Sequence, residues 1–290
     1  MENKYCLGEL LSHGTFLLKE AGIAEAAEDA RYLLLDALKL DLGTFLTHRE
    51  EPVGKEDAAR YLEWIQKRAN GCPAQYITGT QDFMGLTFCV DPRVLIPRMD
   101  TEVLVEAVLT WMPRSRKLLG ADLCTGSGRI AISLLSLGPS DVRMYAADLS
   151  KDALNVAAEN ARRLGVSERL TLCQGDLFDA LPSKCLGTLD YIVSNPPYIP
   201  TREISDLDRN VREYEPNMAL DGGADGLDFY REIIKEASMW LVSGGMLFLE
   251  IGCEQGAAVQ SLLQTADMTE IQILQDLEHR DRVAVARKSR

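Results

Sequence analysis

From residue 118 onward, short apolar segments alternate with longer amphipathic segments, and this alternation restricts the fold more than any other feature of the chain. Stretches such as KDALNVAAENARRLG (151–165) have the period of a helix. Strands that alternate with helices form βαβ units, so the sequence predicts an α/β fold with a mostly parallel, doubly wound sheet of seven strands. The expected strands are LLGADLC (118–124), RMYAADL (143–149), RLTLCQGD (169–176), LDYIVSN (189–195), GGMLFLEIG (244–252), EIQILQDL (270–277) and DRVAVAR (281–287).

The last two expected strands are joined only by the segment EHRD (278–281). A connection between parallel neighbours needs about a dozen residues or more. We therefore expect one strand at that end of the sheet to be antiparallel.

The first 74 residues have a different, helical pattern. The segments 24–40 and 55–71 each place apolar residues on one face, and Gly71 is a candidate helix C-cap. The period then changes in 76–90, which predicts a hairpin that turns near Met84 and Gly85. We expect a helical domain over 1–74, a linker with a hairpin over 75–99, and a catalytic domain over 100–290. The residues expected on the helical faces are Ala30, Leu33, Leu34, Ala37 and Leu38, then Ala58, Leu62, Ile65 and Ala69.

Composition excludes several classes of protein. The 290-residue chain is 46% apolar, which is enough to form a hydrophobic core without disulfides or metal ions. Its net charge of −13 argues against a broad surface that binds nucleic acid. Seven cysteines without a C-x-x-C pair, and three isolated histidines, predict neither disulfides nor a metal site. The N-terminal segment does not have the pattern of a signal peptide, and no apolar run reaches the ~18 residues of a membrane helix. We expect a cytoplasmic protein with reduced thiols.

A glycine-rich segment, DLCTGSGRIA (122–131), follows the first expected strand of the sheet and opens a helix. Gly126 and Gly128 allow a ligand to approach the backbone, and the pattern G-x-G-x-x-A is typical of nucleotide cofactor sites. Asp148 ends the next strand, 20 residues after Gly128, where a carboxylate can bind ribose hydroxyls. The alternatives are a tight strand-to-helix turn for the glycines and a helix N-cap for Asp148.

Two cofactor classes suit this geometry, dinucleotides and S-adenosylmethionine. A dinucleotide brings a pyrophosphate to the helix N-terminus. Asp122, just before the glycines, would repel a pyrophosphate and attract the amino group of S-adenosylmethionine, which favours the latter. Asp176 and Leu177, after the third strand, are candidates to flank an adenine, or else simply begin a loop over the core.

The segment SNPPYIP (194–200) places a rigid structure at the end of the fourth expected strand. Proline fixes φ and has no N–H, so Pro196 and Pro197 offer carbonyl groups without competing donors. The Asn195 side-chain oxygen and a backbone carbonyl can accept the two N–H groups of an amide or amine and orient its lone pair toward a methyl donor. Tyr198 can close over a planar acceptor. The alternative is that NPPY forms only an unusual turn and has no catalytic role.

These segments together resemble the HemK/PrmC family of peptide chain release factor glutamine methyltransferases. The resemblance covers most of the chain. It rests on the helical N-terminal part and on GLTFCVDPRVLIPRMDTEVLVE, DLCTGSGRIAISLL, GDLF, DYIVSNPPYIP, VREYEPNMALDGGADGLDFYR, GGMLFLEIG and RDRVAVAR.

The resemblance implies the S-adenosylmethionine-dependent methyltransferase fold. It also implies methyl transfer to N5 of the glutamine in the Gly-Gly-Gln motif of bacterial class I release factors, with S-adenosyl-L-homocysteine as product. Asn195 and Pro196 would hold the glutamine amide, Pro197 and Tyr198 would complete its pocket, and the helical domain would help dock the release factor. It further implies a monomer. From the acidic net charge and the lack of a long apolar run, we expect no stable nucleic-acid binding and no membrane binding. The predicted cofactor contacts are Asp122, Cys124, Thr125, Gly126, Ser127, Gly128, Asp148, Asp176, Leu177 and Asn195.

The sequence departs from the family pattern at a few positions. Met99 and Cys124 stand where the family usually has proline and where many members have glycine, respectively. Gly120 and Ala121 replace bulkier strand residues, which predicts thinner packing under the cofactor. The long polar segment 201–230 follows the catalytic motif, and we expect it to be a flap that faces the substrate rather than a solvated excursion.

Other functions remain possible at this point. A ribosomal-protein glutamine methyltransferase would share NPPY, and a DNA adenine methyltransferase uses a similar motif but needs a basic groove. An NAD-dependent oxidoreductase would explain the glycines and Asp148 but not NPPY. A binding module without activity would not require Asn195.

Overall fold

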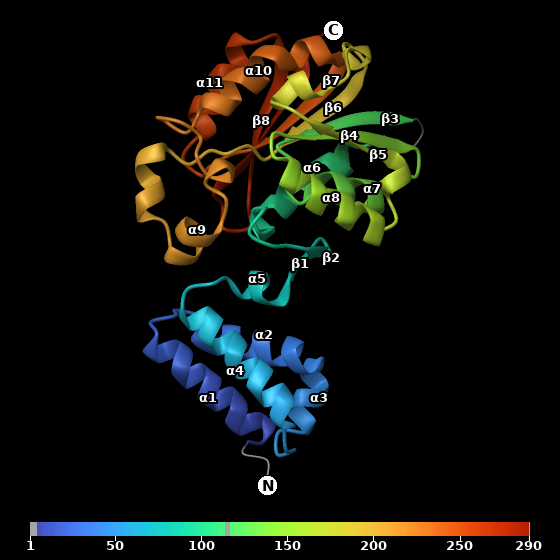
Figure 1. Ribbon diagram of the computed structural model, residues 1–290. Helices are drawn as coiled ribbons and strands as arrows, with labels where there is room; N and C mark the ends of the chain where they lie inside the picture. Colours follow the sequence, from blue (N-terminus) through green and yellow to red (C-terminus); the bar gives the residue numbers. More distant parts are fainter. Residues whose placement is uncertain (1–4, 114–116, 290) are drawn as a thin grey trace. The chain divides into compact units, whose positions relative to one another are not determined.

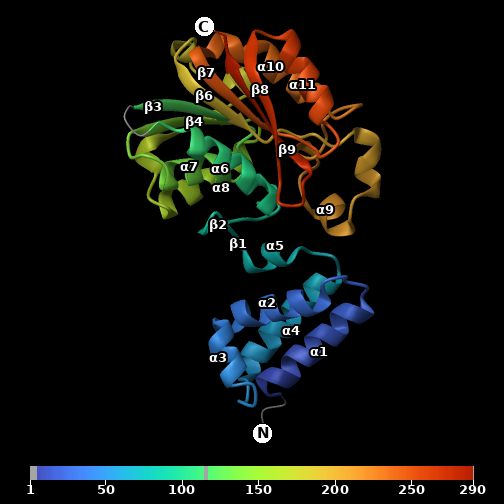
Figure 2. The same cartoon turned by 180° about the vertical axis from the view of Figure 1, so that it is seen from behind.

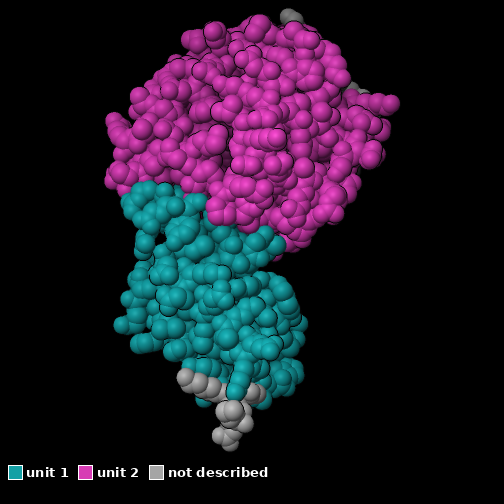
Figure 3. Space-filling view, viewed as in Figure 1, with its two compact units in different colours: residues 1–80, 208–214 teal, residues 81–207, 215–290 magenta. Residues whose placement is uncertain are grey.

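The computed structural model describes residues 5–113 and 117–289, and the chain forms two compact units. The first contains the chain up to Thr80 together with Asp208–Tyr214, and the second contains the rest (Figure 3). The short segment 208–214 therefore belongs to the helical unit, although it lies far along the sequence. The sequence pattern did not predict this assignment. Within the described residues, no helix is both long enough and apolar enough to cross a membrane.

The helical unit is built around a core of leucine and alanine side chains. On α2, Leu33 and Leu34 are fully buried, as the helical pattern predicted. On α4 the fully buried residues are Tyr61 and Ile65, whereas Leu62 is only partly buried, so the expected face is rotated toward Tyr61. The helices are α1 (Leu7–Glu20), α2 (Ala26–Leu38), α3 (Leu42–Thr47), α4 (Lys55–Ala69), α5 (Ala74–Thr78) and α9 (Arg209–Tyr214).

The second unit contains the predicted seven-stranded sheet. Its order is β5-β4-β3-β6-β7-β9-β8, and β9 pairs antiparallel with both β7 and β8. This confirms the fold class and the antiparallel strand that the short connection predicted. The strands are β3 (Leu118–Leu123), β4 (Val142–Asp148), β5 (Leu170–Gln174), β6 (Leu189–Ser194), β7 (Leu241–Glu250), β8 (Met268–Gln275) and β9 (Asp281–Lys288).

Helices cover both faces of this sheet, as Figures 1 and 2 show from opposite sides. One face packs against α6, α7 and α8, and the other against α10 and α11. The strand order reverses between β3 and β6, so the carboxyl ends of these two strands form the switch point where α/β sheets bind ligands. The helices are α6 (Glu102–Trp111), α7 (Arg129–Leu137), α8 (Lys151–Arg163), α10 (Asp228–Trp240) and α11 (Gly256–Thr265).

The predicted hairpin is present as β1 (Thr80–Phe83) and β2 (Leu86–Cys89), and it turns at Met84 and Gly85.

The prediction of thinner packing beneath the site is wrong at Gly120. A Cβ atom there would lie 2.2 Å from Cζ of Tyr191, so the buried tyrosine ring already fills that space.

Candidate active site

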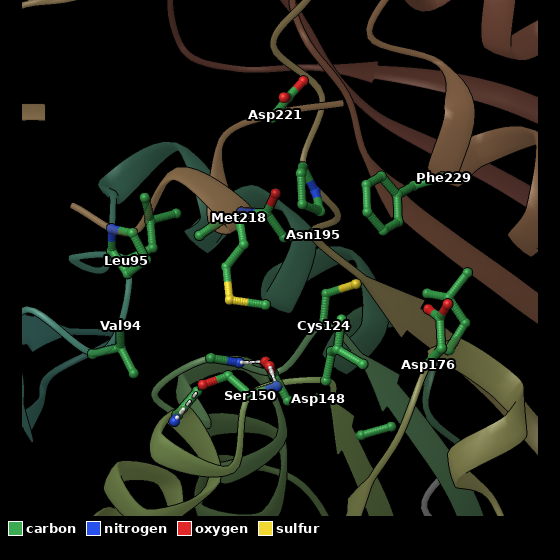
Figure 4. A pocket seen from close by; sticks show the side chains of 18 of the residues that line it. Val94, Leu95, Cys124, Asp148, Ser150, Asp176, Asn195, Met218, Asp221 and Phe229 are labelled. Atoms are coloured by element: carbon green, nitrogen blue, oxygen red, sulfur yellow. Dashed lines mark hydrogen bonds between the residues drawn. The ribbon is translucent and has the colours of Figure 1, made fainter. Parts of the chain in front are cut away.

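A cavity of about 540 Å³ lies at the carboxyl ends of the central strands, within the size range of ligand sites. The loops after β3, β4, β5 and β6 all contribute to its wall, and so does the segment around residues 216–232. Figure 4 shows Cys124, Met218, Asn195 and Phe229 around the same space. The observed position is the one expected for a ligand of a doubly wound sheet.

The glycine-rich loop has the backbone conformation that its sequence predicted. Gly126 and Gly128 have φ of +57° and +79°, in the left-handed region that favours glycine. A Cβ at Gly128 would also approach Ile132 Cδ1 to 2.7 Å. The positive φ therefore favours glycine at this position, and a Cβ there would also lie 3.2 Å from Ala157 Cβ on α8.

Asp148 connects the first two strands of the site. Its Oδ2 accepts a hydrogen bond of 2.8 Å from the Gly126 N–H, and its Oδ1 accepts one of 2.9 Å from the Ser150 N–H. Burial raises the pKa of Asp148, although these two hydrogen bonds act to lower it. The carboxylate thus holds the glycine loop and also faces the cavity.

Two residues of the cavity wall have strained backbone conformations. Cys124 and Leu177 have φ of +60° and +39°, which non-glycine residues rarely adopt, and both line the cavity. Such strain costs about 1–3 kcal/mol per residue and is concentrated at functional sites. The strain at Cys124 shows that the loop keeps a glycine-like conformation even though its residue is cysteine.

Asn195 follows β6, which is buried along its whole length. The Ser194 hydroxyl donates to the Leu123 carbonyl at 2.7 Å and joins the end of β6 to the end of β3. The Asn195 Nδ2 donates to Thr101 Oγ1 at 3.2 Å. Pro196 is buried, Pro197 lines the cavity, and Tyr198 directs its hydroxyl to Glu250 Oε1 at 3.5 Å.

Seven of the predicted site residues line the cavity, and the other six do not. Asp122, Thr125, Ser127, Gly128, Pro196 and Tyr198 are not among the residues that line the cavity. The seven that line it are Cys124, Gly126, Asp148, Asp176, Leu177, Asn195 and Pro197.

Asp122 is fully buried beneath the glycine loop. Its Oδ2 accepts hydrogen bonds from the Thr125 hydroxyl at 2.6 Å and from the Ala131 N–H at 3.3 Å. Burial raises the pKa of Asp122 to about 7. Its observed contacts support the loop, and the direct contact with a cofactor that the sequence suggested remains a prediction.

The sequence analysis missed Arg129, the first residue of α7. Its side chain is buried, with 3% of the residue exposed, and it lines the cavity near Gly126. Among the described residues its guanidinium has no hydrogen-bond partner, although Glu250 and Asp122 attract its charge. An arginine inside the glycine motif was a visible signal, because a helix start buried over a sheet rarely carries a charge.

The segment 201–230, expected as a flap, is ordered into short helices. Its later part lines the cavity with Asn217, Met218, Asp221 and Phe229, while 208–214 belongs to the helical unit. Glu215 lies between these two parts in the sequence. Its side chain is buried and accepts hydrogen bonds from the Ile96 N–H and the Arg98 guanidinium. The role of this segment as a flap remains a prediction.

Comparison with known proteins identifies the family. The PrmC N-terminal domain model matches residues 9–79, and a methyltransferase domain model matches residues 120–237. A release factor glutamine methyltransferase of Moorella thermoacetica is 44% identical over 97% of this chain and 98% of its own length. The chain belongs to the release factor glutamine methyltransferase family.

A release factor glutamine methyltransferase of Cereibacter sphaeroides is also 44% identical, over 93% of this chain and 94% of its own length. A methyltransferase structure from Pyrococcus furiosus aligns with a TM-score of 0.54 at 16% identity, over 82% of this chain and 100% of its own. This likeness shows the fold alone. As a member of the release factor glutamine methyltransferase family, the protein is an enzyme that transfers methyl groups, as the resemblance predicted.

Proposed function

We propose that this enzyme transfers a methyl group from S-adenosylmethionine to N5 of the glutamine in the Gly-Gly-Gln motif of bacterial class I release factors. The observation that carries the proposal is the position of Asn195. Its carboxamide lies at the switch point of the sheet, in the wall of the same cavity as the glycine loop and Asp148. Family membership supports the choice of acceptor.

We propose that S-adenosylmethionine binds in this cavity, because each part of the wall suits one part of that molecule. The Asp148 carboxylate suits the ribose hydroxyls, and Leu177 with Asp176 suits the adenine. The unpartnered Arg129 guanidinium at the start of α7 suits the carboxylate of the methionine part. The product S-adenosylhomocysteine would use the same contacts.

The side chains near Asn195 suit an amide acceptor. Bound S-adenosylmethionine supplies a methyl group on a positively charged sulfur. The Asn195 Oδ1 and the Pro196 carbonyl would accept the two N–H groups of the glutamine amide and direct its lone pair at that methyl group. Transfer of the methyl group would make the amide nitrogen acidic, so its proton would leave to solvent. The proposed mechanism therefore needs no strong base.

The remaining parts of the proposal concern the partner. Pro197 and Tyr198 would complete the pocket for the glutamine side chain, and the helical domain over 1–74 would help dock the release factor. We propose a monomer that acts in the cytoplasm, where translation factors work. All seven cysteines are free thiols, which suits that compartment.

A methyl-transfer assay with labelled S-adenosylmethionine tests the proposal. The acceptors are an unmodified release factor, its Gln→Ala variant in Gly-Gly-Gln, a ribosomal protein mixture and duplex DNA. We expect label in the release factor only, and none in its Gln→Ala variant or with the enzyme variant Asn195→Ala. Label in ribosomal protein or DNA alone would overturn the proposed acceptor.

A further inference from the structure

The segment Asn195–Pro200 has few means of fixing its own position. Three of its six residues are prolines, which have no N–H group, so the segment cannot be paired as a regular strand. Near its end, Ile199 forms an isolated bridge with Asp221. The backbone between Asn195 and this bridge therefore depends on contacts from other parts of the chain.

Gln255, which directly precedes α11, supplies such a contact. Its Nε2 donates to the Tyr198 carbonyl at 2.9 Å and to the Gly226 carbonyl at 3.1 Å. Its Oε1 accepts the Gly252 N–H at 3.0 Å and lies 3.3 Å from the Tyr230 hydroxyl. One carboxamide therefore joins the NPPY segment to two other loops of the catalytic domain.

The backbone groups around Gln255 allow only one orientation of its carboxamide. A backbone carbonyl only accepts hydrogen bonds, and a backbone N–H only donates them. The NH₂ end must therefore face Tyr198 and Gly226, and the oxygen must face Gly252. Glycine at position 226 makes room for this arrangement, because a Cβ there would lie 2.8 Å from Gln255 Nε2 and still closer to the Tyr198 carbonyl oxygen.

Two simpler roles do not account for these contacts. Gln255 stands at the start of α11, yet among the described residues its side chain makes no capping hydrogen bond to that helix. It does not line the cavity either, so its side chain is not placed to touch a ligand there. Its NH₂ group binds instead to two segments that border the cavity, since Pro197 and Gly223 belong to them and line it.

We propose that Gln255 is a positioning residue for methyl transfer, which holds the backbone of the NPPY segment through the Tyr198 carbonyl. A shift of that backbone would move Asn195, three residues earlier, and would misplace the acceptor amide relative to the methyl group. The proposal rests on the proposed function, because it takes Asn195 as the residue that binds the acceptor. The hydrogen bonds of Gln255 do not reach the glycine loop or Asp148.

The variant Gln255→Glu separates this role from a local one at the start of α11. It keeps an oxygen for the Gly252 N–H and adds a negative charge at a helix N-terminus, which a local role would tolerate. However, it loses both N–H donors and places an oxygen against two carbonyl oxygens. We therefore expect kcat for release factor methylation to fall about 10- to 100-fold.

Gln255→Met keeps the length of the side chain and removes all of its hydrogen bonds, so it decides the question if Gln255→Glu does not fold. Its kcat should fall at least ~10-fold, and kcat/KM should fall with it, as for an interaction needed in the transition state. Gln264→Glu is the matched control, because it makes the same charge change at an exposed position on α11. It should keep full activity.

Calorimetry with S-adenosylhomocysteine separates a positioning role from a loss of folded enzyme. It gives the cofactor-site affinity and the fraction of intact sites, and kcat is then expressed per intact site. We expect the affinity of both Gln255 variants to stay within about twofold of the wild type, because Gln255 contacts none of the proposed cofactor residues.

The outcomes distinguish this proposal from the proposed function. If the wild-type enzyme does not label an unmodified release factor, the proposed function fails and the role of Gln255 fails with it. If the wild type labels the release factor and Gln255→Glu or Gln255→Met keeps full kcat per intact site, only the role of Gln255 is overturned. A loss of S-adenosylhomocysteine affinity as large as the loss of kcat would also overturn it, since the whole site would then be disturbed.

Discussion

The carboxylate of Asp148, at the end of β4, accepts a hydrogen bond of 2.8 Å from the backbone N–H of Gly126, which follows the neighbouring strand β3. One side chain therefore shapes the glycine loop and also faces the cavity. Its second oxygen is bound by the Ser150 N–H at the start of α8. Loss of either acceptor oxygen should disturb the loop and the proposed ribose site together.

Asp148→Asn should weaken binding of S-adenosylhomocysteine by about 10- to 100-fold, because the amide keeps only one acceptor oxygen for two backbone N–H donors. Isothermal titration calorimetry measures this directly. Asp141→Asn is the matched control, since Asp141 is exposed just before the opposite end of the same strand. Unchanged affinity in Asp148→Asn would argue against a role in cofactor binding.

Arg129→Met should weaken binding of S-adenosylmethionine about 10-fold or more, because a charge-assisted hydrogen bond to the carboxylate is lost. Decarboxylated S-adenosylmethionine provides the second half of the test. The wild-type enzyme should prefer the complete cofactor, and Arg129→Met should bind both ligands alike. Arg162→Met, at an exposed position on α8, should behave as the wild type does. If Arg129→Met keeps the preference, the carboxylate is bound elsewhere.

Asp122→Asn should change how the stability of the enzyme depends on pH. The folded-state pKa of Asp122 is about 7, above its usual value near 4, so the folded protein keeps a proton that the unfolded chain has released. Stability from this group is therefore present at low pH and is lost as pH rises toward 7. The free energy of unfolding of Asp122→Asn minus that of the wild type should rise by roughly 2–3 kcal/mol between pH 5 and pH 8.

Urea denaturation of both proteins at the two pH values measures this difference. Using the difference removes the contributions of other titrating groups that the two proteins share. A value that is the same at pH 5 and pH 8 would show that Asp122 ionises normally in the folded protein.

Gly222→Ala should slow methyl transfer although residue 222 lies 27 positions beyond Asn195 in the sequence. A Cβ there would lie 2.7 Å from Tyr198 Cα and 2.9 Å from the Pro197 carbonyl oxygen, so the backbone of the NPPY segment must shift. We expect kcat to fall about 10- to 100-fold, the effect of a misplaced reacting group. Affinity for S-adenosylhomocysteine should change little.

Gly54→Ala is the control for this substitution. The nearest atom to a Cβ at Gly54 is Asp57 Oδ2 at 3.5 Å, an ordinary contact, so activity should be kept. Full activity in Gly222→Ala would mean that the NPPY backbone tolerates displacement.

Patterns that depend on neighbours along the chain were predictable. The alternation of strands and helices predicted the sheet, and the short segment EHRD between the last two expected strands predicted the antiparallel strand. The glycine motif and NPPY predicted residues that do line one cavity, including Gly126, Asp148 and Asn195. These predictions succeeded because strand ends of a doubly wound sheet converge at one edge.

Contacts between distant segments were not predictable from such patterns. The expected thin packing at Gly120 was wrong because a tyrosine from another strand, Tyr191, occupies the space. The face of α4 was rotated toward Tyr61 because its neighbours in the helical core, and not its own period alone, decide which side is buried. In both cases the deciding atoms come from a different element.

The amino-acid sequence by itself determined the fold class, the position of the glycine loop and the presence of a rigid Asn-Pro-Pro-Tyr segment at a strand end. Local steric preferences and hydrophobic period are properties of neighbouring residues, so they can be recognised in the linear chain. Only the tertiary structure placed Thr101 within hydrogen-bond distance of Asn195, and the buried Arg129, whose Nε has no hydrogen-bond partner among the described residues, in the cavity wall. Burial and hydrogen-bond geometry arise from packing between elements, and these decide which polar side chains act together.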